Sequence, residues 1–181
     1  MKKISILLIT MLSFNLTFAQ KYMTKTGTID FVSDAPLEKI VGLNKATACL
    51  LDSKTGDINF VVLIKSFVFE KQLLQEHFNE NYMESDKFPK STFKGKITNL
   101  SDINFAKNGD YKAVVEGEMT IHGVTKKIKE SGTITVKGNA VELKSSTTAA
   151  LSDYKIKIPG AVKDKISKNI LVNIKCALSK I

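Results

Sequence analysis

The sequence contains no arginine and no tryptophan, and it has only two histidines and two cysteines. Proteins that read nucleic acids favour arginine for paired hydrogen bonds to guanine and phosphate. The net charge of +9 is carried by lysine alone, so it does not indicate a nucleic-acid partner. We expect the lysines to form a solvated surface, with attraction to anionic headgroups or pyrophosphates as the weaker alternative.

Motifs that carry catalysis or bind metals are also missing. His77 precedes Glu80 by three positions, which gives half a metal site at most, and His122 lies beside Gly123 in a turn. There is no GxSxG turn, no CxxC pair and no phosphate-binding glycine loop. The sequence therefore predicts no catalytic residue, no metal and no cofactor. A lipid hydrolase is the least favoured alternative, and it would require His77 or His122 inside a cavity with an acidic partner.

The two cysteines, Cys49 and Cys176, both fall in predicted strands. An exported protein permits a disulfide, but a domain of this size does not need one. Buried free thiols, which behave as small apolar groups, are the favoured interpretation. The sequence leaves the disulfide open.

The N-terminal residues resemble a secretory signal. Lys2 and Lys3 precede an apolar stretch over residues 4–18, and Ala19 supplies a small residue for cleavage before Gln20. We expect residues 1–19 to be a cleavable signal peptide and residues 20–181 to form one exported domain, periplasmic or secreted. No cysteine lies near Ala19, so a lipid anchor is not expected.

Alternation of apolar and polar residues dominates the rest of the chain. Turn residues at 53–56, 107–110, 122–123 and 137–139 separate about eight such runs. One apolar face per strand is typical of an antiparallel sheet, which can form a sandwich or close into a barrel. The apolar face comprises Ile29, Phe31, Ile58, Phe60, Val62, Ile64, Tyr111, Ala113, Val115, Gly117, Met119, Ile121, Ile128, Gly132, Ile134, Val136, Val141, Leu143, Ile170, Val172, Ile174, Cys176 and Leu178.

One segment interrupts this pattern around residues 70–88. Leu73, Leu74, Phe78 and Tyr82 recur at helical spacing, which predicts a helix over residues 72–81, and Pro89 ends the excursion. A sandwich has no obvious need for an aromatic helix, whereas a barrel can use one as a lid. The segment therefore favours a barrel whose apolar interior encloses a ligand channel.

Two long motifs stand out in the sequence. The run HFNENYMESDKFPKSTFKGKI, residues 77–97, is similar to the histidine-aromatic-(F/Y)P signature of the YceI-like family. The run GEMTIHGVTKKI, residues 117–128, is similar to its second hairpin signature, and the closing I-x-V-x-I pattern at residues 170–174 also fits. The resemblance covers residues 27–178. Gln75 and Glu76 stand where many members carry an Arg-Asp pair.

The resemblance implies a mainly β, single eight-stranded antiparallel lipocalin-like barrel that binds a long apolar lipid, such as a polyisoprenoid or an isoprenoid quinone. It also implies an exported protein with no cofactor chemistry. We expect transient contact with a membrane, and the sequence leaves monomer and homodimer open. Lys126 or Lys155 could meet an anionic head. A same-fold interaction module with a filled interior is the alternative. The candidate lipid-binding residues are Phe31, Phe60, Val62, Ile64, Phe67, Phe69, Phe78, Tyr82, Met83, Phe88, Phe93, Val115, Met119, Leu143 and Ile174.

Overall fold

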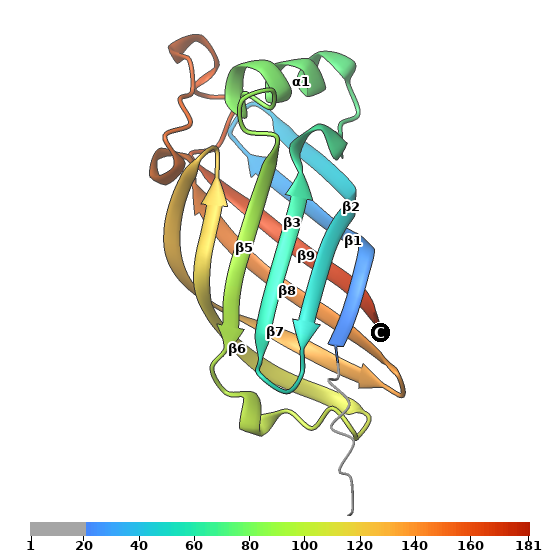
Figure 1. The fold of residues 1–181 in the computed structure, drawn as a ribbon. Coiled ribbons are helices and arrows are strands. Elements are labelled where there is room, and N and C mark those ends of the chain that lie inside the picture. The colour runs from blue at the N-terminus through green and yellow to red at the C-terminus, as the bar shows by residue number, and fades with distance from the viewer. Residues whose placement is uncertain (1–20) are drawn as a thin grey trace, which may run out of the picture.

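The structure, a computed structural model, describes residues 21–181, and the predicted signal peptide lies outside the described residues. The described part is mainly β, with one short α-helix (Figure 1). Its elements are β1 (Lys21–Asp34), β2 (Lys39–Asp52), β3 (Asp57–Leu63), η1 (Ile64–Ser66), β4 (Phe67–Val68), α1 (Gln72–His77), η2 (Phe78–Tyr82), β5 (Lys90–Ile97), η3 (Leu100–Asp102), β6 (Gly109–Ile121), β7 (Val124–Lys137), β8 (Ala140–Ala150), η4 (Leu151–Tyr154), η5 (Gly160–Val162) and β9 (Asn169–Lys180).

Eight of the strands in residues 21–181 close into an antiparallel barrel. Their order is β1-β9-β8-β7-β6-β5-β3-β2, and the pairing of β1 with β2 closes the ring. The two-residue strand β4 pairs with β2 through Leu43 and Val68, beyond the residues of β2 that pair with β3. The predicted barrel is confirmed and the sandwich alternative is wrong. Closure pairs the strand edges that an open sheet would leave exposed.

The tight turns between strands use residues that tolerate a positive φ angle. Gly56 (φ 78°) and Gly138 (φ 58°) lie in the β2–β3 and β7–β8 turns, as their sequence context predicts. The β6–β7 turn consists of His122 (φ 49°) and Gly123 (φ 73°). A two-residue turn with both φ angles positive matches the twist of the strands that it joins.

Strand β7 pairs unequally with its two neighbours. It pairs with β6 along its whole length, but with β8 only over residues 132–137. Residues 124–131 of β7 diverge from β8, and η4 approaches this part of β7, where Lys126 Nζ lies 3.8 Å from Asp153 Oδ1. Side chains and a loop, rather than backbone hydrogen bonds, therefore span the barrel wall between β7 and β8 at this end.

One end of the barrel is closed by packed side chains. The segment between β5 and β6 runs across this end and contributes Leu100, Ile103 and Phe105 to the core (Figure 1). Tyr22 stacks on Phe105 with ring centroids 6.0 Å apart. The buried residues of this closed end are Tyr22, Cys49, Leu51, Ile58, Ile97, Ile103, Ala113, Ile134, Val136, Val141, Leu143, Cys176 and Leu178.

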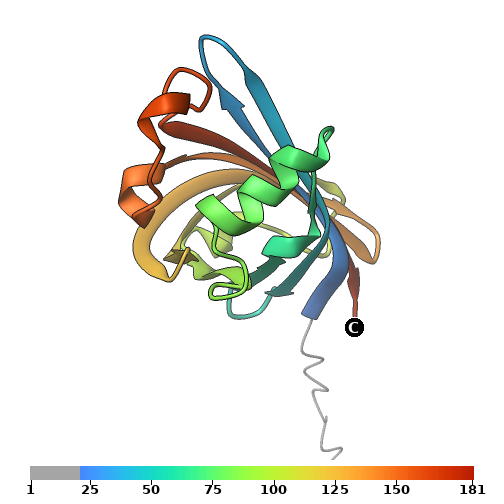
Figure 2. The ribbon, with the colours of Figure 1, turned by 90° about the horizontal axis from the view of Figure 1, so that it is seen from above.

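The excursion between β4 and β5 lies at the opposite end. The predicted helix over residues 72–81 is confirmed as α1 followed by the π-helical turn η2. Viewed from above, this pair lies across the opening of the barrel (Figure 2). No helix in residues 21–181 is long and apolar enough to cross a membrane.

Candidate functional site

The barrel encloses a cavity of about 540 Å³. This volume falls in the range of ~300–1,000 Å³ that is usual for ligand pockets. The inward-facing residues of the strands line it, because successive side chains of a strand point to opposite faces. Its floor consists of Ile58, Ile97, Ala113, Ile134 and Leu143, which also belong to the closed-end core.

Four phenylalanines form an aromatic cluster toward the open end: Phe31, Phe67, Phe69 and Phe78. The Phe78 ring contacts all three others, with centroid distances of 5.3 Å to Phe31, 5.4 Å to Phe67 and 5.0 Å to Phe69. Aromatic pairs at such distances contribute roughly 0.5–1.5 kcal/mol each beyond their burial. The cluster therefore fixes the first residue of η2 to the barrel wall at the cavity.

The rim of the cavity is polar and charged. Glu38, Lys71, His77 and Lys165 line it, and all but the half-buried Glu38 are exposed. Lys71 Nζ lies 4.0 Å from Glu38 Oε1, and this ion pair links the residue before α1 to the β1–β2 hairpin. The rim thus carries side chains of both charges at the open end of the barrel.

A polar group inside the cavity was not expected from the sequence. Glu130 and Thr147 both line the cavity, and Thr147 Oγ1 donates a hydrogen bond of 2.5 Å to Glu130 Oε1. The signal that could have found Glu130 is its position, which is in phase with inward-facing Ile128 and Ile134. A charged side chain in a strand is usually expected to face solvent. The charge of Glu130 therefore favours an outward-facing position, although the alternation of the strand places it inward.

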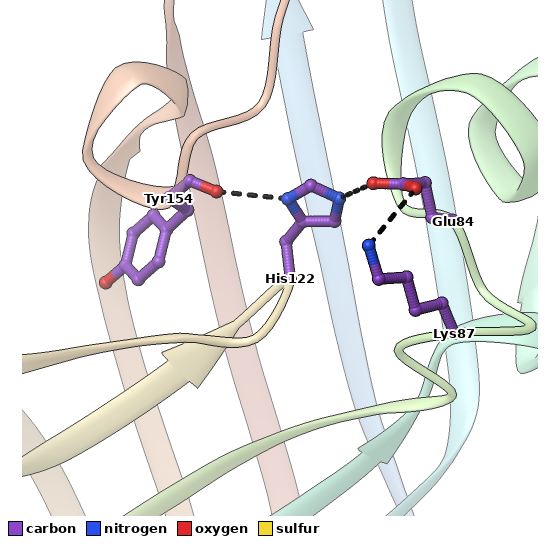
Figure 3. Close-up of polar contacts among 4 residues, drawn as sticks. All are labelled: Glu84, Lys87, His122 and Tyr154. Carbon is purple, nitrogen blue, oxygen red and sulfur yellow. Dashed lines mark hydrogen bonds and ion pairs between the residues drawn. The ribbon is translucent and has the colours of Figure 1, made fainter.

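His122 connects three segments around the open end (Figure 3). Its Nε2 lies 2.7 Å from Glu84 Oε2, and its Nδ1 lies 3.1 Å from the carbonyl oxygen of Tyr154. Glu84, His122 and Lys155, which follows Tyr154, are the residues other than glycine in residues 21–181 that have positive φ angles. Strained backbone therefore concentrates where the excursion, the β6–β7 turn and η4 meet. His122 does not line the cavity.

Fourteen of the fifteen predicted lipid-binding residues line the cavity, and Phe88 does not. The Phe88 ring instead packs edge-on against His122, with centroids 4.7 Å apart, and lies over Gly123. Pro89 turns the chain back toward β5 here, so Phe88 is directed at the β6–β7 turn rather than inward. Lys126 and Lys155 also lie outside the cavity lining. The cavity-lining members of the prediction are Phe31, Phe60, Val62, Ile64, Phe67, Phe69, Phe78, Tyr82, Met83, Phe93, Val115, Met119, Leu143 and Ile174.

Both cysteines are buried and free. Burial raises the pKa of the Cys176 thiol to about 11, and burial together with the nearby Cys176 raises the pKa of Cys49. The thiols therefore stay protonated and pack as small apolar groups. Within residues 21–181, no group of three or more His, Cys, Asp or Glu side chains could hold a metal ion.

Three solved structures that share the fold are distant from this chain in sequence. A polyisoprenoid-binding domain from Saccharophagus degradans, implicated in plant cell wall breakdown, aligns with a TM-score of 0.78 at 13% identity, over 89% of this chain and 98% of that one. Burkholderia cenocepacia BcnA aligns with a TM-score of 0.68 at 14% identity, over 84% and 96%. A YceI protein from Campylobacter jejuni aligns with a TM-score of 0.59 at 18% identity, over 77% and 84%.

These alignments show that the antiparallel barrel described above is a fold that this chain shares with these proteins. No curated protein sequence matches the chain significantly. The sequence profile of the YceI-like domain matches residues 9–178, which is nearly the whole chain. The chain therefore belongs to the YceI-like family, as its two motifs predict.

Proposed function

We propose that this protein binds a long apolar lipid, a polyisoprenoid or an isoprenoid quinone, inside the barrel. The observation that carries the proposal is the cavity of about 540 Å³ with an apolar lining and an aromatic cluster toward its mouth. The polyisoprenoid-binding domain from Saccharophagus degradans, which shares the fold, supports the choice of ligand class.

Burial of hydrocarbon alone gives sufficient affinity. Each buried methylene contributes roughly 0.8 kcal/mol, so a five-carbon isoprene unit contributes on the order of 3–4 kcal/mol. Micromolar affinity requires about 8 kcal/mol net of the costs of association and ordering. A few buried units therefore suffice, and binding requires few polar contacts.

The length of the cavity sets how much of a chain it can enclose. Ala113 and Ile121 both line the cavity from β6, and eight residue steps of ~3.4 Å place them about 27 Å apart along the strand. A strand tilt of about 40° reduces this to ~20 Å along the barrel axis. A longer polyisoprenoid must fold back or extend through the mouth.

Apolar residues exposed around the open end suit transient contact with a membrane. Leu37 in the β1–β2 turn, Val68 in β4 and Leu73 in α1 are 71%, 61% and 61% exposed. Lys71 and Lys165 lie at the adjoining rim. Apolar side chains beside lysines are the combination that favours an anionic lipid surface, and an exported carrier could load its ligand there.

The two other functions are supported less well. A barrel with a filled interior would act only through its surface, and the open cavity disfavours it. A lipid-acting enzyme would need a histidine and an acid inside the cavity. The His122–Glu84 pair lies outside the cavity lining, and no residue in 21–181 forms an ion pair with His77 at the rim. We therefore propose binding without catalysis.

Native mass spectrometry of the protein purified from its own cells tests the proposal. We expect an apolar adduct that organic extraction removes and that added prenyl lipid or quinone restores. Consistent absence of an adduct, together with failure of the extracted protein to bind prenyl lipids or quinones, would rule the function out. Collisional release at low energy would identify the ligand by its mass.

A further inference from the structure

Glu130, a half-buried residue, places its carboxylate in the lower part of a cavity whose lining is mostly apolar. In the β6–β7 ladder Glu130 is paired with Val115. Along β7, Glu130 is six residues from Val124 at the open end, which is a distance of ~20 Å. The next inward position toward the closed end is Gly132, which pairs with the floor residue Ala113. Glu130 is thus one inward position above the floor.

The partners of this carboxylate are incomplete. Thr147, itself buried, donates to Oε1. Ser145 Oγ, at the next inward position of β8, donates instead to the carbonyl oxygen of Ser131. No lysine or histidine of residues 21–181 forms an ion pair with Glu130. The other oxygen, Oε2, has no hydrogen-bond donor among residues 21–181 and is available to a ligand in the cavity.

Tyr154 supplies a second polar group to the same region. Its side chain is buried, lines the cavity and extends away from His122 (Figure 3). The pKa of Tyr154 is raised mainly by burial and further by the negative charges of Asp153 and Glu130. Tyr154 lines the same cavity as Glu130 and Thr147, and η4, which carries Tyr154, contacts both β7 and β8, the strands that carry these two residues.

A wholly apolar chain that filled the cavity would displace the water around Glu130 and leave the carboxylate oxygen without a donor. Removing donors from a buried charged group is strongly unfavourable. A ligand that carries its own donor avoids this loss and gains a charge-assisted hydrogen bond. The cavity therefore distinguishes between apolar ligands by the polar group that they bring.

We propose that Glu130, Thr147 and Tyr154 form an inner polar subsite that accepts the hydrogen-bond donor of an amphipathic lipid, a hydroxyl or a protonated amine. The ligand then lies with its donor toward the floor and its apolar chain toward the aromatic cluster. For an isoprenoid quinone, the subsite favours the hydroquinone, which carries hydroxyl donors, over the quinone, which carries none. This inference rests on the proposed function and adds the class of the ligand's head and its orientation.

Four ligands with the same fifteen-carbon chain test the subsite: farnesene, farnesol, farnesylamine and farnesyl phosphate. Their affinities are measured by displacement of the hydrocarbon probe diphenylhexatriene from the full mature chain. We expect farnesol and farnesylamine to bind at least tenfold more tightly than farnesene, and more tightly than farnesyl phosphate, whose anionic head Glu130 repels.

Three variants test whether the affinity advantage of the donor ligands depends on Glu130. Glu130→Leu should reduce the tenfold advantage of both donor ligands to less than twofold and should strengthen farnesene binding. Glu130→Gln keeps an acceptor without the charge, so farnesol should retain most of its advantage while farnesylamine loses it. Glu118→Leu makes the same chemical change on the exposed outer face of β6 and should leave all four affinities unchanged.

The possible failures are distinguishable. If none of the four ligands displaces the probe, the proposed function itself fails. If farnesene and farnesol bind equally to the wild type, or the advantage persists in Glu130→Leu, the subsite is refuted while lipid binding stands. Tightest binding of farnesyl phosphate, unaffected by Glu130→Leu, would place the head at the rim lysines and also refute the subsite. Should Glu130→Leu fail to fold, the wild-type series and Glu130→Gln decide the question.

Discussion

The two ends of this barrel are built from the same strands but are filled in different ways. At the closed end, inward side chains of opposite strands meet and a loop carrying Leu100, Ile103 and Phe105 covers them. At the open end, the inward side chains of the same strands line a cavity, and the aromatic cluster holds the excursion across it. The alternation of apolar and polar residues determines which side chains face inward. The segment that covers each end determines whether these side chains pack into a core or surround a cavity.

This difference separates stability from binding. Side chains at the closed end are fully buried among each other, so their loss leaves a cavity in a packed core. Three of the four phenylalanines of the aromatic cluster at the open end are only partly buried, and the cluster faces space that a ligand would fill. Substitutions at the closed end should therefore lower the stability with little effect on lipid affinity. Substitutions at the open end should lower lipid affinity with little effect on the stability.

The largest effect is expected at the centre of the aromatic cluster. Phe78→Asp places a carboxylate among Phe31, Phe67 and Phe69 near the cavity mouth, and these aromatic neighbours offer it no hydrogen-bond donor. We expect prenyl-lipid affinity to fall at least 1,000-fold, which corresponds to ~4 kcal/mol. Displacement of diphenylhexatriene measures the affinity, and far-ultraviolet circular dichroism should show an intact sheet.

Val61→Asp is the matched control for this substitution, because Val61 lies on the outer face of β3. It introduces the same charge in the same barrel and should leave the affinity unchanged. If Phe78→Asp unfolds the sheet, the cluster is part of the structural core, and the separation between the two ends fails.

A smaller effect, of the opposite kind, is expected at the closed end. Leu51 is 0% exposed, so Leu51→Ala should lower the free energy of unfolding by about 3 kcal/mol. Urea denaturation measures this loss, while prenyl-lipid affinity at a temperature where the variant is folded should change less than twofold. A large loss of affinity with normal stability would show that the cavity extends below its floor to Leu51.

The next prediction concerns the contacts of His122 at the open end. Asparagine tolerates a positive φ angle, so His122→Asn keeps the turn but removes the imidazole contacts to Glu84, Tyr154 and Phe88. We expect a loss of about 1–2 kcal/mol and faster amide hydrogen exchange in η4 and in the residues before β5. Unchanged exchange in both segments would mean that His122 does not hold the excursion to the barrel.

Much of the barrel could be predicted from local patterns. The alternation of Tyr111, Ala113 and Val115, the turn at His122-Gly123 and the helical spacing of Leu74 and Phe78 each reflect short-range geometry. The cavity-lining positions follow from the same period of two. These signals require no knowledge of which strands are neighbours.

What the sequence could not show depends on contacts between distant segments. The pairing of β1 with β9, the first and last strands of the described chain, and the divergence of β7 from β8 are long-range outcomes. Phe88 points at the β6–β7 turn because Gly123 leaves room for its ring there. Glu130 faces inward against its residue type, and Thr147 on the neighbouring strand supplies the donor that makes this tolerable.

The smallest effect is expected from reducing agents, and it concerns the closed end. Cys49 and Cys176 are both buried there and are free. A disulfide between them would typically add 2–4 kcal/mol to the free energy of unfolding. For a domain of this size, 1 kcal/mol corresponds to ~2–4 °C in the melting temperature, so reduction of the disulfide would lower that temperature by about 4–16 °C. Free thiols predict no shift. Comparing thermal melts of protein exported to an oxidising compartment, with and without reductant, decides between the two states. Both thiols should also resist alkylation until the barrel unfolds, because their raised pKa keeps the reactive thiolate scarce. A lower melting temperature in reductant would mean that a crosslink, and not packing alone, holds the closed end together.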